Sequence, residues 1–569
     1  MNHAAISRQT HLDGTGNNDR TGIIPIIFLL VILFFSAWIR FEGITEQGIN
    51  PGDAFRYVRE AKIWADGKPP TFEGVIYRPL SYFLQAAAIK IFGYNDYSTK
   101  ILHGFMDMIN IILIFLIAAG LAENAWVGVV NSLLYAFLPA VVKLTRNEMV
   151  HVEGTTFVLL AFYFFFLFDK HGKKGFKGYF LLFLSGLNSG LAANTHADLA
   201  FLAPGYVLYL FIKSYYSQNK KESLKTFLIF AFIFSFSFFT PYLAGFLIFG
   251  FKKVFLVLIS EFNVVTDYMK NISGSISSFQ LFWEILIGSI KSFFGKPFLF
   301  ISILLIGTIF IIIYRKVRKE SDPLCMYLPL LLILSYAFLF SCFLNSFEIG
   351  YGRYFMALIP SLILTVSLWY YKISKQFLGK FSLIGFTCLF LILFLINPKE
   401  LPGKRKFKSP YRGIYDILKN NVNSKNKLLL APVSLYSFDR GYQLDLYFGK
   451  NAVYLCRLPL ESEYNPESLN TRLNGMNIRY IFVGKQIDTR LLNPDSLIWR
   501  RYNPWFNNDR NPYSLKKDLK IIKTYIRSKG GLLVNANRFG KIYYLSGEED
   551  AQKNLIADGL SLERLDSYE

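Results

Sequence analysis

The run at residues 23–38, IIPIIFLLVILFFSAW, decides the class of fold, because it is apolar almost throughout and carries no charge. Similar runs recur along the chain, and a stretch of about 17–25 predominantly apolar residues is long enough to cross a membrane as a helix. No clear small-residue cleavage site follows the first run, so we interpret it as an uncleaved span rather than a signal peptide. The sequence therefore predicts an integral membrane protein.

About eleven such runs are predicted to be spans. Those after the first are residues 101–121, 126–142, 154–168, 179–193, 199–212, 227–249, 298–314, 326–343, 355–371 and 381–396. The run at residues 80–92 is short and interrupted by Gln85 and Lys90, so we expect an interfacial helix there. The predicted fold class is mainly α, a polytopic membrane protein whose membrane domain covers residues 23–397.

The formal net charge of +22 first suggests nucleic acid as a partner, but the position of the charges argues against it. Lys and Arg gather in short tracts between apolar runs, in the loops at residues 170–177, 213–225, 315–319 and 372–380. With a cytoplasmic N-terminus, all four loops lie on the cytoplasmic side, as the positive-inside rule requires. We therefore expect a multi-pass protein of the cell (inner) membrane, with a disordered cytoplasmic segment at residues 1–22.

The C-terminal region, residues 398–569, is more polar, and the same count places it outside the cytoplasm. Strands are predicted at residues 427–432 and 477–484, a hairpin at 531–545 and an amphipathic helix at 411–422. We interpret the region as a soluble α/β domain with a binding or lid role. Neither it nor the spacing of the four cysteines shows a metal or nucleophile motif.

The first external loop, residues 41–100, contains the most distinctive polar stretch, PGDAFRYVREAKIWADGKPPTFEGVIYRPLSY at residues 51–82. Asp53 is followed by Arg56 and Tyr57, one helical turn away on the same face. Arg78 and Tyr82 end the stretch. Acids, guanidinium groups and aromatic faces beside a membrane suit a substrate that joins a sugar to a lipid phosphate.

A third motif, Arg353-Tyr354, begins the tenth predicted span at the same membrane face. The three motifs, in this order and on this side, resemble those of the GT-C superfamily of membrane glycosyltransferases. The branch containing protein O-mannosyltransferases and the lipid A aminoarabinose transferase is the most similar. The resemblance covers roughly residues 20–400.

The resemblance implies an activity and its partners. The donor would be a sugar on a polyprenyl phosphate, transferred with inversion to a hydroxyl of a glycan, lipid or protein acceptor at the external face of the bilayer. Many members carry a second acid directly after the first, where this chain has Ala54. That departure favours the metal-independent members, so no metal or other cofactor is expected.

The resemblance also implies roles for particular residues. Asp53 would be the catalytic base, and a second catalytic acidic residue would lie after Arg146, either at Glu153, which we prefer, or at Glu148. The residues expected to bind substrate are Arg56, Tyr57, Arg78, Tyr82, Arg146, Glu148, Asp198, Arg353 and Tyr354.

Several of these residues also have a structural interpretation. Asp53 could cap the helix that follows it, and Arg56 could pair with Glu60. Arg353 could anchor the entrance of a span at the membrane surface, and Glu153 and Asp198 could each cap the start of a span. Asp107 lies inside a predicted span and should face protein or water, where it either pairs with another span or acts in catalysis. The histidines at 103, 151 and 196 lack the spacing of metal ligands and are expected at polar contacts between helices.

Three other functions remain open. An O-antigen polymerase or ligase also uses lipid-linked sugars, but such proteins tend to carry their large loop late in the chain. A multi-span transporter of lipid-linked sugars would show related halves and broken helices at the midplane, and the sequence shows neither. A receptor anchored by its spans would not need so many of them.

Overall fold

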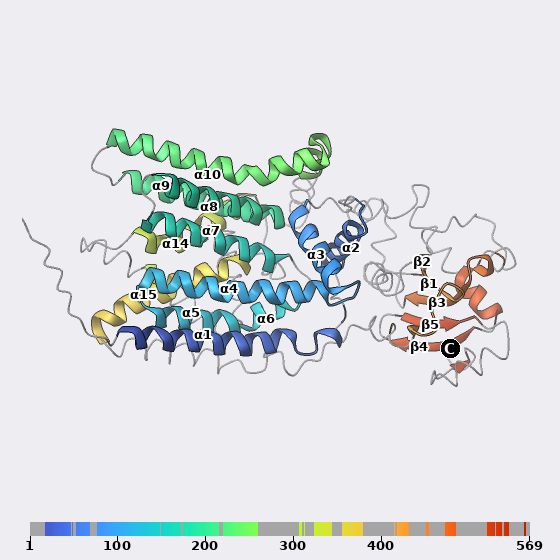
Figure 1. Cartoon of the computed structure of the whole chain (residues 1–569). Helices are drawn as coiled ribbons and strands as arrows, with labels where there is room; N and C mark the ends of the chain where they lie inside the picture. Colours follow the sequence, from blue (N-terminus) through green and yellow to red (C-terminus); the bar gives the residue numbers. More distant parts are fainter. Residues whose placement is uncertain are drawn as a thin grey trace, which may run out of the picture.

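The structure is a computed structural model of the chain. It describes residues 18–46, 48, 53–68, 77–147, 150–171, 175–215, 220–259, 307–309, 312, 324–343, 356–378, 415, 418–431, 451–454, 471, 473–484, 521–529, 531–537, 540–545 and 563–564. Within these residues the chain forms a bundle of long helices and a separate mixed β-sheet (Figure 1).

The bundle consists of helices that run side by side, with α1 and α10 at opposite edges (Figure 1). Its helices are α1 (Asn18–Phe41), α4 (Ser98–Ala122), α5 (Ala125–Phe137), α6 (Pro139–Thr145), α7 (His151–His171), α8 (Phe176–Thr195), α9 (Ala203–Tyr215), α10 (Lys220–Phe249), α14 (Leu328–Phe343) and α15 (Ile359–Leu378). Two 3-10 segments, η2 (Ala197–Leu202) and η3 (Leu324–Tyr327), lead into α9 and α14.

Among the described residues, five helices are long and apolar enough to cross a membrane, or six if a bent pair counts as one span. The chain is therefore a multi-pass membrane protein. Helix α8 matches a predicted span but falls short of that test, because glycine, serine and asparagine lower its hydropathy. The predicted spans at 298–314 and 381–396 lie largely or wholly outside the described residues, so the total of eleven stays a prediction.

The bent pair replaces the single continuous helix expected over residues 126–142. Helices α5 and α6 meet at an angle of 61°. Leu138 between them has extended backbone angles, and Pro139 occupies the first turn of α6. Proline has no N–H and its ring clashes with the preceding turn, which favours a break here, whereas α10 continues through Pro241.

Helices α8 and α10 approach each other backbone to backbone. Gly186 and Gly190 lie one turn apart on α8, and a Cβ at either would overlap the carbonyl oxygen of Phe234 or Phe238 on α10. Small residues spaced four apart are typical of close helix contacts in membranes.

A buried ion pair joins α1, α4 and α5. The Arg40 guanidinium lies 2.5 Å from Asp107 Oδ2, and both side chains are fully buried. Tyr135 donates to Asp107 Oδ1 at 2.9 Å, and Arg40 also donates to the carbonyl oxygen of Ala136 at 2.9 Å. Of the two roles considered for Asp107, pairing with another span is the one that the structure shows.

Helices α2 (Asp53–Ala65) and α3 (Pro79–Phe92) cover the end of the bundle nearest the sheet (Figure 1). Helix α2 begins at Asp53, the residue expected to precede it. Helix α3 is the short helix expected between residues 80 and 92. Pro79 in its first turn has a backbone angle suited to starting a helix.

The sheet has the strand order β2-β1-β3-β5-β4-β6. Its strands are β1 (Lys427–Ala431), β2 (Ala452–Tyr454), β3 (Ile478–Gly484), β4 (Leu532–Asn537), β5 (Gly540–Tyr544) and β6 (Glu563–Arg564). Strand β1 pairs in parallel with β2 and β3, and the other pairings are antiparallel. The predicted strands and hairpin are confirmed, whereas most of the predicted helix at 411–422 lies outside the described residues.

Candidate functional site

Three of the predicted substrate-binding residues meet at the covered end of the bundle. Arg78, just before α3, donates from Nη1 to the hydroxyl of Tyr57 on α2. Its guanidinium carbon lies 5.1 Å from the centroid of the Tyr57 ring, and the Tyr82 ring centroid lies 6.4 Å from that of Tyr57. All three side chains are buried. A desolvated guanidinium over an aromatic face is held by the electrostatic attraction of the ring.

An apolar cluster surrounds these side chains. It comprises Ala54, Tyr57, Tyr77, Tyr82, Val150 and Val254, all buried. Tyr77 packs on Gly245 of α10, where a Cβ would overlap the tyrosine hydroxyl. Burial raises the pKa of Tyr77 to about 12. The cluster therefore connects α2, the start of α3, the residue before α7 and the end of α10.

A second polar group lies farther along α3. Arg78, Tyr82 and Gln85 follow one another at helical spacing and share one face. Gln85 Nε2 donates to Glu153 Oε1 at 2.9 Å, and His103 Nε2 lies 2.9 Å from the same oxygen. His103 Nδ1 lies 3.0 Å from the carbonyl oxygen of Asn147. Glu153, Gln85 and His103 are fully buried.

Arg146 makes its hydrogen bonds at the end of α1. Its guanidinium donates to the carbonyl oxygens of Ile39 at 2.9 Å and Glu42 at 2.6 Å. Carbonyl groups at the C-terminal end of a helix have no partner within the helix, so an arginine there satisfies them. The structure thus gives Arg146 a role in holding the chain between α6 and α7 to α1.

Asp198 belongs to a third polar group, between α8 and α14. Its Oδ2 accepts from the hydroxyl of Tyr336, and its Oδ1 pairs with Nδ1 of His196. The rings of His151 and His196 lie 4.9 Å apart. The two histidines and His103 therefore lie at polar contacts between helices, as expected from the sequence.

The remaining predicted site residues are not described. Glu148, Arg353 and Tyr354 lie outside the described residues, as do the side chains of Asp53 and Arg56. In the part of the chain that the structure describes, no group of three or more His, Cys, Asp or Glu side chains could hold a metal ion.

Sequence reasoning did not assign a functional role to Gln85, His103 or Tyr336. A signal for the first two was present, because each interrupts an apolar helix. Polar residues at such positions usually face another polar group inside the bundle.

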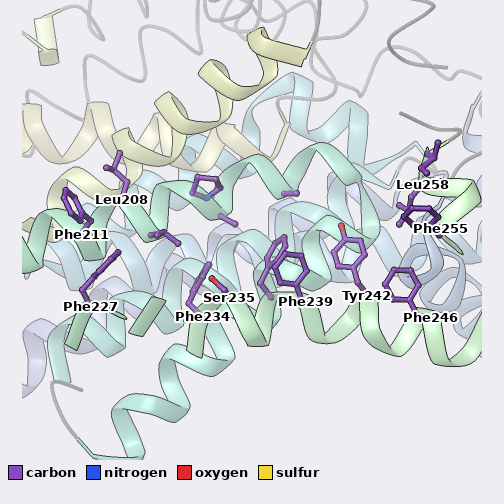
Figure 2. A pocket seen from close by; sticks show the side chains of 16 residues that line it. Leu208, Phe211, Phe227, Phe234, Ser235, Phe239, Tyr242, Phe246, Phe255 and Leu258 are labelled. Atoms are coloured by element: carbon purple, nitrogen blue, oxygen red, sulfur yellow. The ribbon is translucent and has the colours of Figure 1, made fainter. Parts of the chain in front are cut away.

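An apolar groove runs along α10 (Figure 2). It has a volume of about 1080 Å³ and is lined by residues of η2, α9, α10 and the helical segment 251–259. The lining on α10 extends from Phe227 to Phe246, which at 1.5 Å per residue is roughly 28 Å. That length is close to the thickness of the hydrocarbon core of a bilayer.

Residues 77–244, from the start of α3 into α10, match the family described as "Dolichyl-phosphate-mannose-protein mannosyltransferase". No curated protein matches the chain in sequence.

Several solved structures are similar at low identity. The oligosaccharyltransferase of Archaeoglobus fulgidus in its apo form has 11% identity and a TM-score of 0.48. The match covers 92% of this chain and 75% of the oligosaccharyltransferase chain. The archaeal oligosaccharyltransferase AglB from the same organism, in complex with an inhibitory peptide and a dolichol-phosphate, has 12% identity and a TM-score of 0.46. The match covers 92% of this chain and 74% of that one. ArnT from Cupriavidus metallidurans bound to undecaprenyl phosphate has 11% identity and a TM-score of 0.49. The match covers 93% of this chain and 98% of that one.

Proposed function

We propose that this chain is a membrane glycosyltransferase of the GT-C superfamily, as the match over residues 77–244 supports. It would transfer a sugar from a polyprenyl-phosphate-linked donor to an acceptor hydroxyl. The family match carries the proposal, since the family is named for a dolichyl-phosphate sugar donor. The acceptor would be a hydroxyl of a glycan, lipid or protein, and transfer at the external face would invert the anomeric carbon.

In this proposal Asp53 removes the proton from the attacking hydroxyl. A free aspartate has a pKa near 3.9 and is a weak base, so it must act by position and partial desolvation. Asp53 is the first residue of α2, and its neighbour Ala54 is buried in the apolar cluster with Tyr57. That anchoring would hold the backbone of the base in place.

Arginine side chains would stabilise the departing lipid phosphate. Negative charge builds up on the phosphate as the glycosidic bond breaks, and guanidinium groups can bind it with two parallel hydrogen bonds. Arg78 is buried beside Tyr57 and Tyr82, where electrostatic attraction is stronger than in water. We assign supporting roles to Arg56 and to Arg353 with Tyr354, and expect no metal to be needed.

The groove along α10 supports a lipid-linked donor. Its lining is almost entirely apolar, and its end at Tyr242 and Phe246 of α10 packs against the cluster that holds Tyr57 and Tyr82. A polyprenyl chain in the groove would exchange lipid contacts for protein contacts along its length. Its phosphate would then lie near the end of the bundle that carries α2 and α3.

Substitution of the proposed base tests the function. Asp53→Asn should lower transfer by about 10²–10⁴-fold, the range for loss of a general base. The measurement is the amount of the missing glycan restored to a deletion strain by each variant, by mass spectrometry. Asp66→Asn, an exposed carboxylate at the other end of α2, is the matched control and should restore it fully. Near-normal restoration by Asp53→Asn would remove Asp53 as the base.

Chelation tests the expectation about metals. Membranes treated with EDTA should keep their transfer activity, because the proposed charge stabilisation comes from arginines. A loss of activity that a divalent cation restores would show instead that a metal takes part.

A further inference from the structure

We propose that His103 and Glu153 form a charge-neutral pair sharing one proton, and that this pair positions the turn before α7 against α2. Both would then be positioning residues for sugar transfer, and Glu153 would not exchange a proton with the substrate. The inference rests on the proposed function, in which α2 carries the base.

The first step is a proton count at His103. The carbonyl oxygen of Asn147 can only accept, so His103 Nδ1 must carry the proton of the 3.0 Å contact. One further proton must then lie between His103 Nε2 and Glu153 Oε1, which are 2.9 Å apart, since two lone pairs would otherwise face each other. Whether that proton sits on the imidazole or on the carboxyl group, the pair has no net charge. A neutral pair is what full burial favours.

The second step is what the pair holds. Through Asn147 it fixes one end of the turn between α6 and α7, and through Glu153 it fixes the first turn of α7. Val150 lies between these two points, and its carbonyl oxygen accepts from the N–H of Gly154 at 3.1 Å.

The third step leads from the turn to α2. The Val150 side chain is fully buried in the apolar cluster that contains Ala54 and Tyr57 of α2. Arg146, the neighbour of Asn147, ties the same end of the turn to the end of α1. A shift of the turn would therefore move the surface on which the first turn of α2 rests, and misplacement of a reacting group by 1 Å can lower a rate by ~10²-fold.

The hydrogen-bond pattern makes one substitution decisive. In Glu153→Gln, an amide nitrogen in the place of Oε1 can donate one proton to His103 Nε2 and the other to Gln85 Oε1, if the Gln85 amide turns over. Gln85 Oε1 has no hydrogen-bond partner among the described residues and is free to accept. This neutral network keeps the shape and the number of contacts, so it should keep the position of the turn while removing any acid–base function.

The experiment compares Glu153→Gln, Glu153→Ala and His103→Ala in the full-length protein. Glycan restored to the deletion strain is measured as above, and hydrogen exchange of peptides covering residues 146–152 is measured on the purified protein in detergent. Glu123→Gln, an exposed carboxylate at the far end of α4, is the matched control. Asp53→Asn is the reference for loss of catalysis.

We expect Glu153→Gln to stay within about threefold of wild type with unchanged exchange, because its network has as many hydrogen bonds as the original. The two alanine variants should lose ~10²-fold in transfer and exchange faster at residues 146–152. Asp53→Asn should lose transfer with exchange unchanged.

Two results would overturn the inference. If Glu153→Gln loses transfer as Asp53→Asn does while its exchange stays normal, Glu153 itself acts on the substrate. If the alanine variants leave exchange at the turn unchanged, the pair does not hold it, whatever their activity. Full activity of Asp53→Asn would instead contradict the proposed function, and the exchange data would still decide the role of the pair.

Discussion

Two buried pairs lie one turn apart on α4 and are built differently. Asp107 is paired with Arg40, and both of its oxygens accept hydrogen bonds, Oδ2 from Arg40 and Oδ1 from Tyr135. His103 is paired with Glu153, whose second oxygen, Oε2, has no hydrogen-bond partner among the described residues.

The two pairs differ in whether their side chains can change protonation when a partner is removed. Arginine keeps its proton under all ordinary conditions, so the Arg40–Asp107 pair is permanently charged and complete. Histidine and glutamate can each gain or lose a proton, so the other pair can stay neutral after a change. The complete pair connects helices α1, α4 and α5, whereas the adaptable pair lies beside the proposed site.

The largest effect should follow from breaking the complete pair. Asp107→Ala leaves a buried guanidinium without its counter-charge, which typically lowers stability by about 3–5 kcal/mol. Unfolding of the purified protein in mixed micelles measures the loss. The double variant Arg40→Met/Asp107→Leu should recover most of it, because apolar side chains of similar size need no counter-charge. A double variant as unstable as the single one would contradict this account.

A smaller effect is expected from the adaptable pair. His103→Ala should lower stability by about 1–3 kcal/mol, the range for leaving one buried polar group unsatisfied. Glu153 still accepts a hydrogen bond from Gln85 after this change, whereas Arg40 in Asp107→Ala loses the carboxylate that balances its charge. The same unfolding assay measures it. If His103→Ala proved as destabilising as Asp107→Ala, the difference between the two pairs would not exist.

The smallest effect concerns the hydroxyl of Tyr135. Tyr135→Phe removes the 2.9 Å bond to Asp107 Oδ1 and the 3.4 Å bond from Asn110 Nδ2, but leaves the ion pair and the 3.4 Å bond from Asn110 to Asp107. We expect a loss of about 0.5–1.5 kcal/mol in the same assay. A loss approaching that of Asp107→Ala would mean that Tyr135, rather than Arg40, is the main support of the carboxylate.

Much of the bundle could be predicted from the sequence, because long apolar runs leave few alternatives in a membrane. The bend between α5 and α6 could not be predicted from Pro139 alone, since α10 continues through Pro241 as one helix. The partner of Asp107 could not be predicted either. Arg40 is 67 residues away, and which helices become neighbours depends on side-chain packing that no local pattern reports.

Part of the candidate site could also be predicted from the sequence. Motif order grouped Tyr57, Arg78 and Tyr82, and the structure brings these three together. Membrane sidedness also grouped Arg146 and Asp198 with them, but it gives no direction for a side chain. The structure directs Arg146 to the end of α1 and Asp198 to Tyr336, contacts that depend on tertiary packing.

The contact of Gly186 and Gly190 with α10 has a mechanical consequence. Where backbones touch, no side chain can rotate to let two helices separate, so α8 and α10 should move as one rigid unit. The groove along α10 then has one fixed wall. Any widening or narrowing to suit lipids of different thickness must come from the rest of the lining, on η2, α9 and the segment at 251–259.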